Sequence, residues 1–408
     1  MVRKAAAEKP HTTAAVDPRQ FPLSALLSQI LVAFTIEFDN EFELRMAGAG
    51  YPGVNLSFMI WANLIRLIPA EGVTVGDLAS RAYAGENCHA LGCLERWRFV
   101  VLEGAAPGKP AGSRAESGNE RRDGWGSGRG IRRDWTVRLT RKGRTASEIW
   151  AALPSELEER WRSRFGEERI ARLRSSLRGL VDQFELELPW GLPADWLGEG
   201  QYPKREKRVS DEVGLLSLLS QVLLAFALEY NRESKTPIAL AANVVRVLGD
   251  KPVRSSEIPR LTGTSPEQCA IGWRFKPYVT VERDPKLGRG TVARLTDVGK
   301  RAKKKYERLT KEIEQRWREK FCGELREALV DVLLARCEGK LCLSAGMVPP
   351  VGVIRSGVAA PALGRKKVAS AARQRGKDLV AQSAEFVRDP IGALPHYPLW
   401  DMNRGFGP

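Results

Sequence analysis

Apolar residues recur at helical spacing in two long segments of the chain. In the first segment they lie three or four positions apart, at Leu23, Leu26, Leu27, Ile30, Leu31, Phe34 and Phe38. This spacing predicts a helix from Pro22 through about Phe42. A second apolar run predicts another long helix over residues 213–233. Both runs are apolar on more than one face, which is typical of a helix buried between two subunits.

Shorter patterns follow each long helix in one common order: further helices, a two-stranded hairpin, and long helices again. The first set is predicted at residues 56–68, 74–83, 86–96, 97–103, 135–140 and from 145 onward. The second set is predicted at residues 238–248, 255–261, 266–276, 278–296, 299–321 and 324–337. The expected fold class is therefore mainly α with small β-hairpin wings.

The order of elements repeats because much of the sequence repeats. The letters LSALLSQILVAFTIEFDNE at 23–41 correspond to LSLLSQVLLAFALEYNRE at 216–233. Likewise, VRLTRKGRTA from Val137 corresponds to ARLTDVGKRA from Ala293. A period of about 180 residues is too long for a solenoid repeat, which has roughly 20–50. The chain therefore contains two diverged copies of one small domain.

Residues that match between the copies indicate what both copies need. Glu37 and Glu229 match near the predicted end of each first helix, where they are expected to cap the helix or to line a ligand cleft. Trp161 and Trp317 also match and are expected in the core. In copy one, Thr74 followed three residues later by an aspartate predicts a capped helix start.

The pattern divides the chain into five parts. These are a disordered arm at 1–20, copy one at 21–187, a linker at 188–212, copy two at 213–338, and a basic, largely disordered tail at 339–408. The linker is rich in proline, glycine and charge. The aromatic end of the tail, residues 394–400, is able to pack back on the core.

The overall charge points to a class of partner. The 408 residues carry a formal net charge of +16, and the pI is about 9.7. This favours a polyanion, for which we expect double-stranded DNA, although an anionic membrane surface or solubility alone would give the same charge. The six cysteines show no CxxC spacing and there are three histidines, so no metal site, cofactor or disulfide framework is expected. The opening segment lacks the apolar core of a secretory signal, so a cytoplasmic, nucleoid-associated protein with no membrane segment is expected.

Copy two contains the clearest candidate for a helix-turn-helix, in the letters LTGTSPEQCAIGWRF. Gly263 can end one helix. Thr264 or Ser265 can cap the next helix, and Pro266 suits its first turn. The polar positions expected on this recognition helix are Ser265, Glu267, Gln268 and Arg274. Glutamine can read adenine and arginine can read guanine. A solvated polar face is the alternative interpretation.

The two hairpins carry the remaining candidates for DNA contact. In copy two the hairpin tip holds Arg283, Lys286 and Arg289 among glycines that allow a sharp turn. Cations at such a tip favour contact with phosphates. The wing of copy one is longer, and its candidates are Arg121, Arg122, Arg129, Arg132 and Arg133. A flexible insertion with incidental charge is the alternative for this longer wing.

Each copy resembles a winged-helix domain of the multiple-antibiotic-resistance regulator (MarR) family. The resemblance covers roughly 21–187 and 213–337, and it rests on the hairpin followed by VRLTRKGRTA or ARLTDVGKRA and on the long flanking helices. It implies dimerisation through helices from both termini and binding of DNA as a two-fold dimer. Some members respond to small ligands, so a small-molecule effector is among the implied partners. Because two copies are fused, the resemblance implies an intramolecular pseudo-dimer.

The copies differ where the recognition helices are expected. GENCHALGCLERW at 85–97 occupies the place of SPEQCAIGWRFKP at 265–277. A symmetric dimer reads a palindrome because its halves are identical. We therefore predict a non-palindromic DNA site, or a site read by copy two alone.

Three other functions remain open from the sequence. An architectural, nucleoid-associated protein would bind DNA with little sequence preference and a steep salt dependence. An enzyme is not expected, because the chain shows no GxxxxGK, no HExxH and no paired nucleophile and base, and no catalytic residue is assigned. A regulator whose wing has lost DNA binding would instead bind a protein partner.

Overall fold

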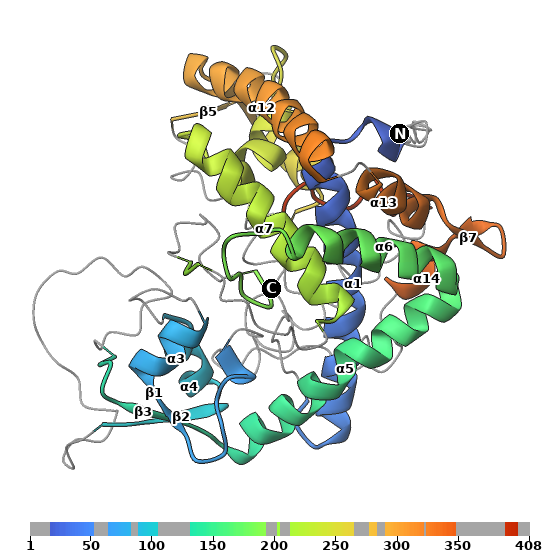
Figure 1. Ribbon diagram of the computed structural model, residues 1–408. Coiled ribbons are helices and arrows are strands. Elements are labelled where there is room, and N and C mark those ends of the chain that lie inside the picture. Colours follow the sequence, from blue (N-terminus) through green and yellow to red (C-terminus); the bar gives the residue numbers. More distant parts are fainter. Residues whose placement is uncertain are drawn as a thin grey trace, which may run out of the picture.

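The computed structural model describes residues 17–52, 64–82, 89–104, 131–192, 202–204, 213–264, 277–283, 290–321, 324–347 and 388–398. These residues form a mainly helical molecule with small antiparallel three-stranded sheets and a two-stranded hairpin. Helices α1 (Leu23–Gly48) and α7 (Leu215–Glu233) pack together at the centre (Figure 1). None of the described helices is long and apolar enough to cross a membrane.

Helix α1 extends beyond its predicted end at Phe42 and continues to Gly48. Phe42 and Met46 are both fully buried one turn apart, so the apolar face continues past the predicted boundary. Arg45 also pairs with Glu41 across one turn, with 2.9 Å between Nε and Oε1. This i,i+4 pair supports the added turns of helix.

Copy one forms a three-stranded sheet with helices between its first two strands. Its elements are β1 (Val73–Thr74), α3 (Val75–Ala82), α4 (His89–Arg96), β2 (Val100–Glu103) and β3 (Thr136–Leu139). The strand order is β1-β3-β2. The predicted cap of α3 is confirmed, because the Thr74 hydroxyl accepts the Asp77 N–H at 3.1 Å. That hydroxyl also donates to the Asp77 carboxylate at 2.8 Å.

Copy two repeats this arrangement. Its elements are α8 (Ile238–Leu240), the π-helical turn η2 (Ala241–Val245), β4 (Val253–Arg254), the 3₁₀ turn η3 (Ser255–Glu257), α9 (Ile258–Thr262), β5 (Val279–Arg283) and β6 (Thr291–Leu295). The strand order β4-β6-β5 is the counterpart of β1-β3-β2. The hairpin predicted in each copy is therefore confirmed.

A threonine and a glycine join each sheet to the long helix that follows it. These helices are α5 (Arg141–Phe165) and α12 (Asp297–Phe321). The Thr140 hydroxyl accepts the Gly143 N–H at 3.1 Å, and the Thr296 hydroxyl accepts the Gly299 N–H at 3.0 Å. A Cβ on either glycine would collide with a backbone carbonyl, that of Phe99 or of Tyr278. The repeated letters LTxxG thus fix a close approach of helix and strand in both copies.

Helix α5 begins earlier than expected. It starts at Arg141 with Thr140 as its N-cap, rather than near residue 145, and it runs through Pro154 without ending. Proline lacks the N–H that would bond the carbonyl four residues earlier, here that of Trp150. The helix continues because its apolar face stays buried on both sides of the proline, at Trp150 and at Leu157.

Each copy supplies a glutamate to the first helix of the other copy, and Glu158 is buried while Glu314 is partly buried. Glu158 of α5 accepts the Leu215 N–H at the start of α7 at 2.9 Å. Glu314 of α12 accepts the Leu23 N–H at the start of α1 at 3.1 Å. A carboxylate at a helix N-terminus satisfies a free N–H and complements the helix dipole. The two contacts are reciprocal, as in a two-fold dimer.

Arginines hold both glutamates in place. Glu158 pairs with Arg162 at 3.0 Å and with Arg174 of α6 (Glu167–Val181) at 2.7 Å. Glu314 pairs with Arg318 at 3.6 Å and with Arg326 of α13 (Leu325–Leu334) at 2.5 Å. One continuous hydrophobic core contains residues of α1, α5, α6, α7, α12 and α13. The two copies therefore share this central core, while the β4–β6 sheet of copy two and the helices beside it enclose a second, smaller cluster around Val245, Leu248 and Leu295.

A second matched contact joins each first helix to the long helix of its own copy. The Trp161 indole donates to Glu37 at 3.1 Å, and the Trp317 indole donates to Glu229 at 2.6 Å. Both tryptophans are buried, as expected. Glu37 lies in the middle of α1, so the expectation that it caps the helix end is wrong. Its carboxylate instead satisfies a buried indole N–H, which would otherwise cost free energy.

Each copy also ends in a strap that crosses to the other copy. We define strap one as residues 186–192 and strap two as residues 388–398. The matched glutamines Gln221 and Gln29 donate to them, to the carbonyls of Leu188 at 3.0 Å and of Ile391 at 2.9 Å. Strap two lies inside the expected tail. Its Leu394 and Tyr397 are buried, as expected for an aromatic end that packs back on the core.

Another described part of the tail is packed as well. It comprises β7 (Arg336–Cys337), β8 (Lys340–Leu341) and α14 (Cys342–Gly346). Cys342, Leu343 and Met347 are buried in the shared core. The basic tail expected from residue 339 therefore contributes apolar side chains to the fold.

Strap two is expected to make stability depend on pH through His396. Burial, together with the Arg246 guanidinium, lowers the pKa of His396 well below the ordinary 6.5. Below about pH 6.5, the ordinary pKa of histidine, the unfolded chain binds a proton that the folded chain does not. The free energy of unfolding therefore falls as the pH falls. The slope contributed is at most about 1.4 kcal/mol per pH unit.

The measurement is urea unfolding at about pH 7.5 and about pH 5.5, for the wild type and for His396→Phe. Phenylalanine keeps an aromatic ring beside Phe21, whose ring lies 4.6 Å from that of His396. The variant is expected to lose less stability than the wild type at the lower pH. An equal loss in both proteins would show that His396 does not carry this dependence.

Candidate nucleic-acid interface

Most side chains predicted to contact DNA lie outside the described residues. These are Ser265, Glu267, Gln268 and Arg274 of the expected recognition helix, Lys286 and Arg289 of the second wing, and Arg121, Arg122 and Arg129 of the first wing. Arg132, Arg133 and Arg283 are described, as are the elements that frame both hairpins. The structure therefore describes the helices and strands that flank the other candidate residues.

The turn before the expected recognition helix of copy two is firmly held. Helix α9 ends at Gly263, whose φ of +69° is the left-handed conformation that suits glycine. The predicted role of Gly263 is thus confirmed. The Thr262 and Thr264 hydroxyls then meet at 2.6 Å. Strap two packs directly on this turn, since a Cβ on Gly263 would lie 2.6 Å from the carbonyl carbon of Leu394.

Arg246 connects this turn to the rest of copy two. Its guanidinium donates to the carbonyl of Ala242 at 2.8 Å and to that of Leu261 at 3.4 Å. Burial lowers the pKa of Arg246, because a charged group is disfavoured away from water. The sequence alone showed only that Arg246 matches Arg66 of copy one.

The second hairpin presents cations on its exposed positions. Arg283 is exposed at the end of β5, opposite Thr291 in the strand register. Arg294 is exposed on β6, opposite Thr280, and Arg254 is exposed on β4. Sequence reasoning missed Arg254 and Arg294. Each is a charged letter next to apolar letters, in VR of β4 and TVARL of β6, and this was the signal that could have found them.

One of the two described arginines at the first wing is already paired with a carboxylate. Arg132 forms a bidentate pair with Asp134, at 2.9 and 2.8 Å. This bond raises the pKa of Arg132 and lowers the pKa of Asp134. The Arg133 backbone carbonyl accepts the Gly76 N–H at 2.9 Å, at the start of α3. This backbone bond joins the base of the first wing to α3.

The two hairpins differ in the charge pairing of one matched arginine. Arg138 on β3 pairs with Glu103 at 3.0 Å and also donates to the Glu71 carbonyl. Its counterpart in copy two is Arg294, since each stands one residue before the leucine of the LTxxG letters. Among the described residues, Arg294 has no ion-pair partner. The second hairpin therefore offers more uncompensated positive charge to an anion.

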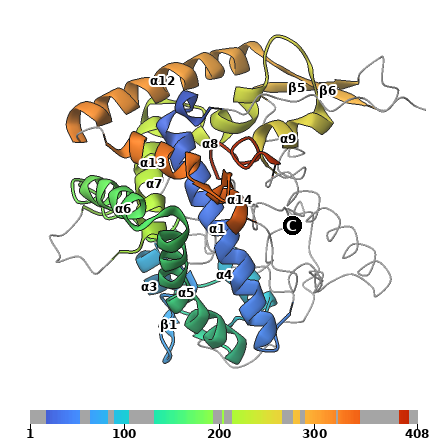
Figure 2. The same cartoon turned by 90° about the vertical axis from the view of Figure 1, so that its right-hand side faces the viewer.

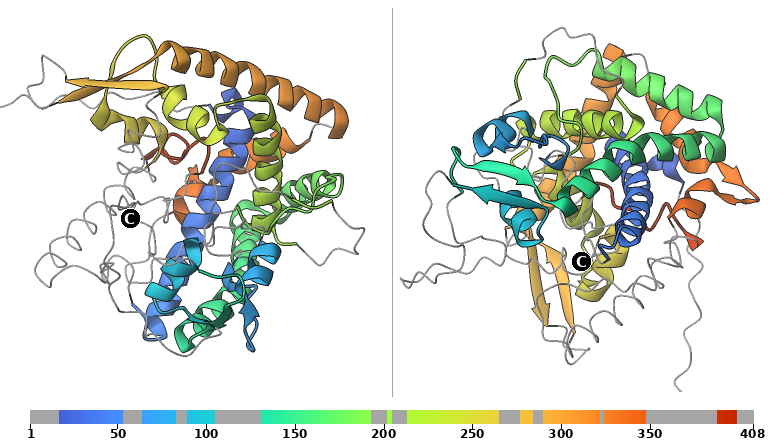
Figure 3. Two further views of the ribbon diagram at one scale, coloured as in Figure 1. Left: turned by 90° about the vertical axis from the view of Figure 1, so that its left-hand side faces the viewer. Right: turned by 90° about the horizontal axis from the view of Figure 1, so that it is seen from below.

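The two hairpins lie near opposite ends of α1 (Figure 1), and in the left-hand panel of Figure 3 the β5–β6 hairpin extends away from the copy-one sheet.

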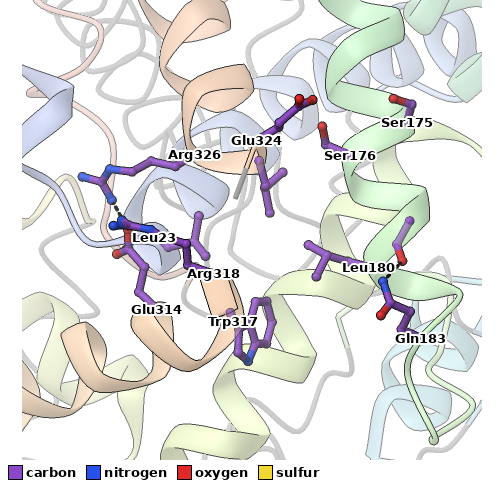
Figure 4. Close-up of a pocket in the computed structure, with 12 residues that line it drawn as sticks. Leu23, Ser175, Ser176, Leu180, Gln183, Glu314, Trp317, Arg318, Glu324 and Arg326 are labelled. Carbon is purple, nitrogen blue, oxygen red and sulfur yellow. Dashed lines mark hydrogen bonds and ion pairs between the residues drawn. The ribbon is translucent and has the colours of Figure 1, made fainter. Parts of the chain in front are cut away.

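A cavity of about 290 Å³ lies at the seam between the C-terminal helices of the two copies (Figure 4). Its walls come from α6, α12 and α13, and Trp317 forms part of its floor. The Glu314 carboxylate in this wall is already satisfied by Arg326 and by the Leu23 N–H. The cavity is close to the lower size limit of small-molecule sites, about 300 Å³.

A larger cavity of about 550 Å³ lies between α5 and the start of α7. Trp150 and Trp190 line it, and the Arg66 guanidinium stacks over the Trp190 ring at 4.5 Å. The buried Trp150 indole N–H has no hydrogen-bond partner within the described part of the chain. A small ligand that accepts a hydrogen bond would satisfy this group.

Three comparisons with known proteins find no match to this chain. No family model, no curated protein and no solved structure matches this chain. Within the described residues, no group of three or more His, Cys, Asp or Glu side chains is placed to hold a metal ion.

Proposed function

We propose that this chain is a DNA-binding transcriptional regulator built as an intramolecular pseudo-dimer of two winged-helix domains. The observation that carries the proposal is the repetition of one sheet and helix order in two copies that exchange helix-capping glutamates, Glu158 and Glu314. A two-fold protein dimer reads two half-sites on one duplex. The reciprocal glutamate contacts support the same mode of binding here.

In this proposal the helices at about 86–96 and 266–276 enter the major groove, and the hairpins contact the backbone or the minor groove. The N-terminal half of a recognition helix lies nearest the base edges. The hairpin arginines contribute mainly electrostatic, sequence-independent affinity. The buried turn at Gly263, held by strap two, supports a rigid presentation of the second recognition helix.

The two half-sites are proposed to be unequal. Arg132 and Arg138 of copy one are paired with carboxylates, whereas Arg294 of copy two has no such partner among the described residues. The sequences at the two recognition helices also differ. Copy two would therefore bind phosphates more strongly, and the preferred site would be asymmetric.

Selection of bound fragments from a random DNA pool, at low and at near-physiological salt, tests the proposal. An enriched asymmetric motif that survives the higher salt is the expected result. A palindromic motif would mean that whole chains pair. Binding without any motif would favour an architectural protein with little sequence preference.

The hairpin of copy two is expected to dominate the salt dependence of binding. Arg283→Ala with Arg294→Ala should reduce the slope of log K against log salt by about 1 for each arginine that contacts a phosphate. The matched control is Arg132→Ala with Arg138→Ala in copy one, where both guanidiniums already bind carboxylates. Titration of a labelled duplex over a salt series gives both slopes.

The control pair is expected to change the slope less than the copy-two pair. An unchanged slope for Arg283→Ala with Arg294→Ala would reject the hairpin as a DNA contact. It would favour a protein partner for this surface instead.

A further inference from the structure

Helix α12 carries a stripe of cations on the face opposite its buried side. Arg301, Lys304, Arg308 and Lys311 are spaced by three, four and three residues, and all four are exposed. Such spacing places side chains along one face of a helix. The buried face of α12 contains Ala302, Tyr306, Leu309, Ile313 and Trp317. We call the four exposed cations the basic ridge.

The fold does not require this charge. Helix α5 occupies the equivalent place in copy one, and the LTxxG letters match the two helices residue by residue. At the positions of the ridge, α5 has Thr145, Glu148, Ala152 and Ser155. The same helix is therefore built in copy one without any of the four cations.

The ridge lowers stability unless an anion neutralises it. Like charges three or four residues apart on a helix cost roughly 0.2–0.5 kcal/mol per pair. Arg308 has a compensating neighbour, Glu312, at 3.2 Å. Arg301, Lys304 and Lys311 have no ion-pair partner within the described part of the chain. Three adjacent charges on an exposed face thus remain available to a partner.

The dimensions of the ridge match one strand of a duplex. Lys311 lies ten residues after Arg301, so the two are about 15 Å apart along the helix axis. One strand of B-DNA advances about 3.4 Å per phosphate, so this length faces about four phosphates. Four cations span this length, and one of them, Arg308, also pairs with a carboxylate, that of Glu312.

The position of the ridge connects it to the second hairpin. Helix α12 begins two residues after β6, with only Thr296 between them. Figure 2 shows α12 and the β5–β6 hairpin extending in roughly opposite directions from this junction. A duplex held by the hairpin could therefore continue along the ridge.

We propose that the basic ridge binds the phosphate backbone of duplex DNA that flanks the site read by the recognition helices. This inference rests on the proposed function and extends it from the half-sites to their flanks. The contact is electrostatic and independent of sequence. It lengthens the duplex that one chain covers, on the side of copy two only.

The test compares two duplexes: the selected motif alone, and the same motif within a longer duplex. The ridge variant is Arg301→Ala with Lys304→Ala. The matched control is Arg336→Ala with Lys340→Ala in the β7–β8 hairpin, which also removes one exposed arginine and one exposed lysine. Figure 1 shows that hairpin on the opposite side of the molecule from β5. A cooperative thermal unfolding transition by circular dichroism, at a temperature no lower than that of the wild type, checks that each variant is folded.

The ridge variant should reduce the slope of log K against log salt by about 2 on the longer duplex, because two phosphate contacts are lost. Its slope on the motif alone should equal that of the wild type, and the control should show no difference that depends on duplex length. An equal change on both duplexes, or no change on either, would overturn the proposal. Loss of binding to a poly-glutamate peptide with unchanged DNA slopes would assign the ridge to an acidic protein segment.

The proposed function fails in a different way. If the wild type binds duplexes with and without the motif equally tightly, sequence-specific regulation is rejected. This holds whatever the ridge variant does. If the motif is bound and duplex length has no effect, only the ridge proposal is rejected.

Discussion

Gly299→Ala is expected to destabilise the chain by at least about 3 kcal/mol, because its new Cβ would meet the Tyr278 carbonyl oxygen. Both groups belong to the backbone or are fixed to it, so neither can move without separating α12 from the hairpin. The displaced hairpin should also weaken binding of the selected DNA. Urea unfolding followed by circular dichroism gives the loss of stability, and titration of the duplex gives the loss of affinity.

Gly179→Ala is the matched control for this substitution. Gly179 lies within α6, and no other group comes within 4 Å of the position that its Cβ would occupy. Alanine there should raise stability by about 0.4–1 kcal/mol, since it restricts the unfolded chain without a clash. Similar effects of the two substitutions would show that the close approach at Gly299 is not a constraint.

Glu158→Ala is expected to cost about 3–5 kcal/mol, the usual loss when one partner of a buried ion pair is removed. The Glu158 side chain is 7% exposed, and it binds Arg162, Arg174 and the Leu215 N–H. Alanine would remove the buried carboxylate that Arg162 and Arg174 share and would leave the start of α7 without its acceptor. Urea unfolding of the whole chain measures the effect.

The neighbouring Glu159 provides the control. Its side chain is 71% exposed, and its contact with Arg162 is a surface pair at 3.3 Å. Glu159→Ala should change the free energy of unfolding by no more than about 0.5 kcal/mol. Glu158→Gln should lose less than Glu158→Ala, because the amide oxygen can still accept the Leu215 N–H. Equal losses at 158 and 159 would contradict the capping role of Glu158.

The sequence predicted the local elements well because their causes are local. Thr74 and Asp77 are close in the chain, and the cap they predict is present. Gly263 ends α9 because glycine tolerates a positive φ, which is a property of that residue alone. The hairpins follow from alternating strand residues, and each is formed. The sequence shows the four cations of the basic ridge. That they lie on the exposed face of α12 follows only from the structure, which shows which face of the helix is buried.

Contacts between distant residues could not be predicted in this way. The carboxylate of Glu37 was assigned to a helix end because its bond with Trp161 spans 124 residues. Aligning the repeated blocks that begin at Ala90 and Ala270 matches Phe99 with Val279. The strand registers instead place Val100 opposite Leu139 and Val279 opposite Leu295, a shift of one residue. The aromatic end of strap two was expected to pack on the core, but its bond with Gln29, more than three hundred residues earlier, was not predicted.

The reciprocal glutamates bear on the order in which a newly made chain can complete its fold. The contact of Glu158 with Leu215 closes a loop of 57 residues, whereas that of Glu314 with Leu23 closes one of 291. Closure of a longer loop costs more entropy, and contacts of high sequence separation slow folding. During synthesis α1 emerges first, yet its acceptor at Glu314 and its cover in strap two emerge last. The N-terminal half would therefore leave the ribosome with an apolar helix exposed. During translation this half is expected to be captured by chaperones until the C-terminal half has been made.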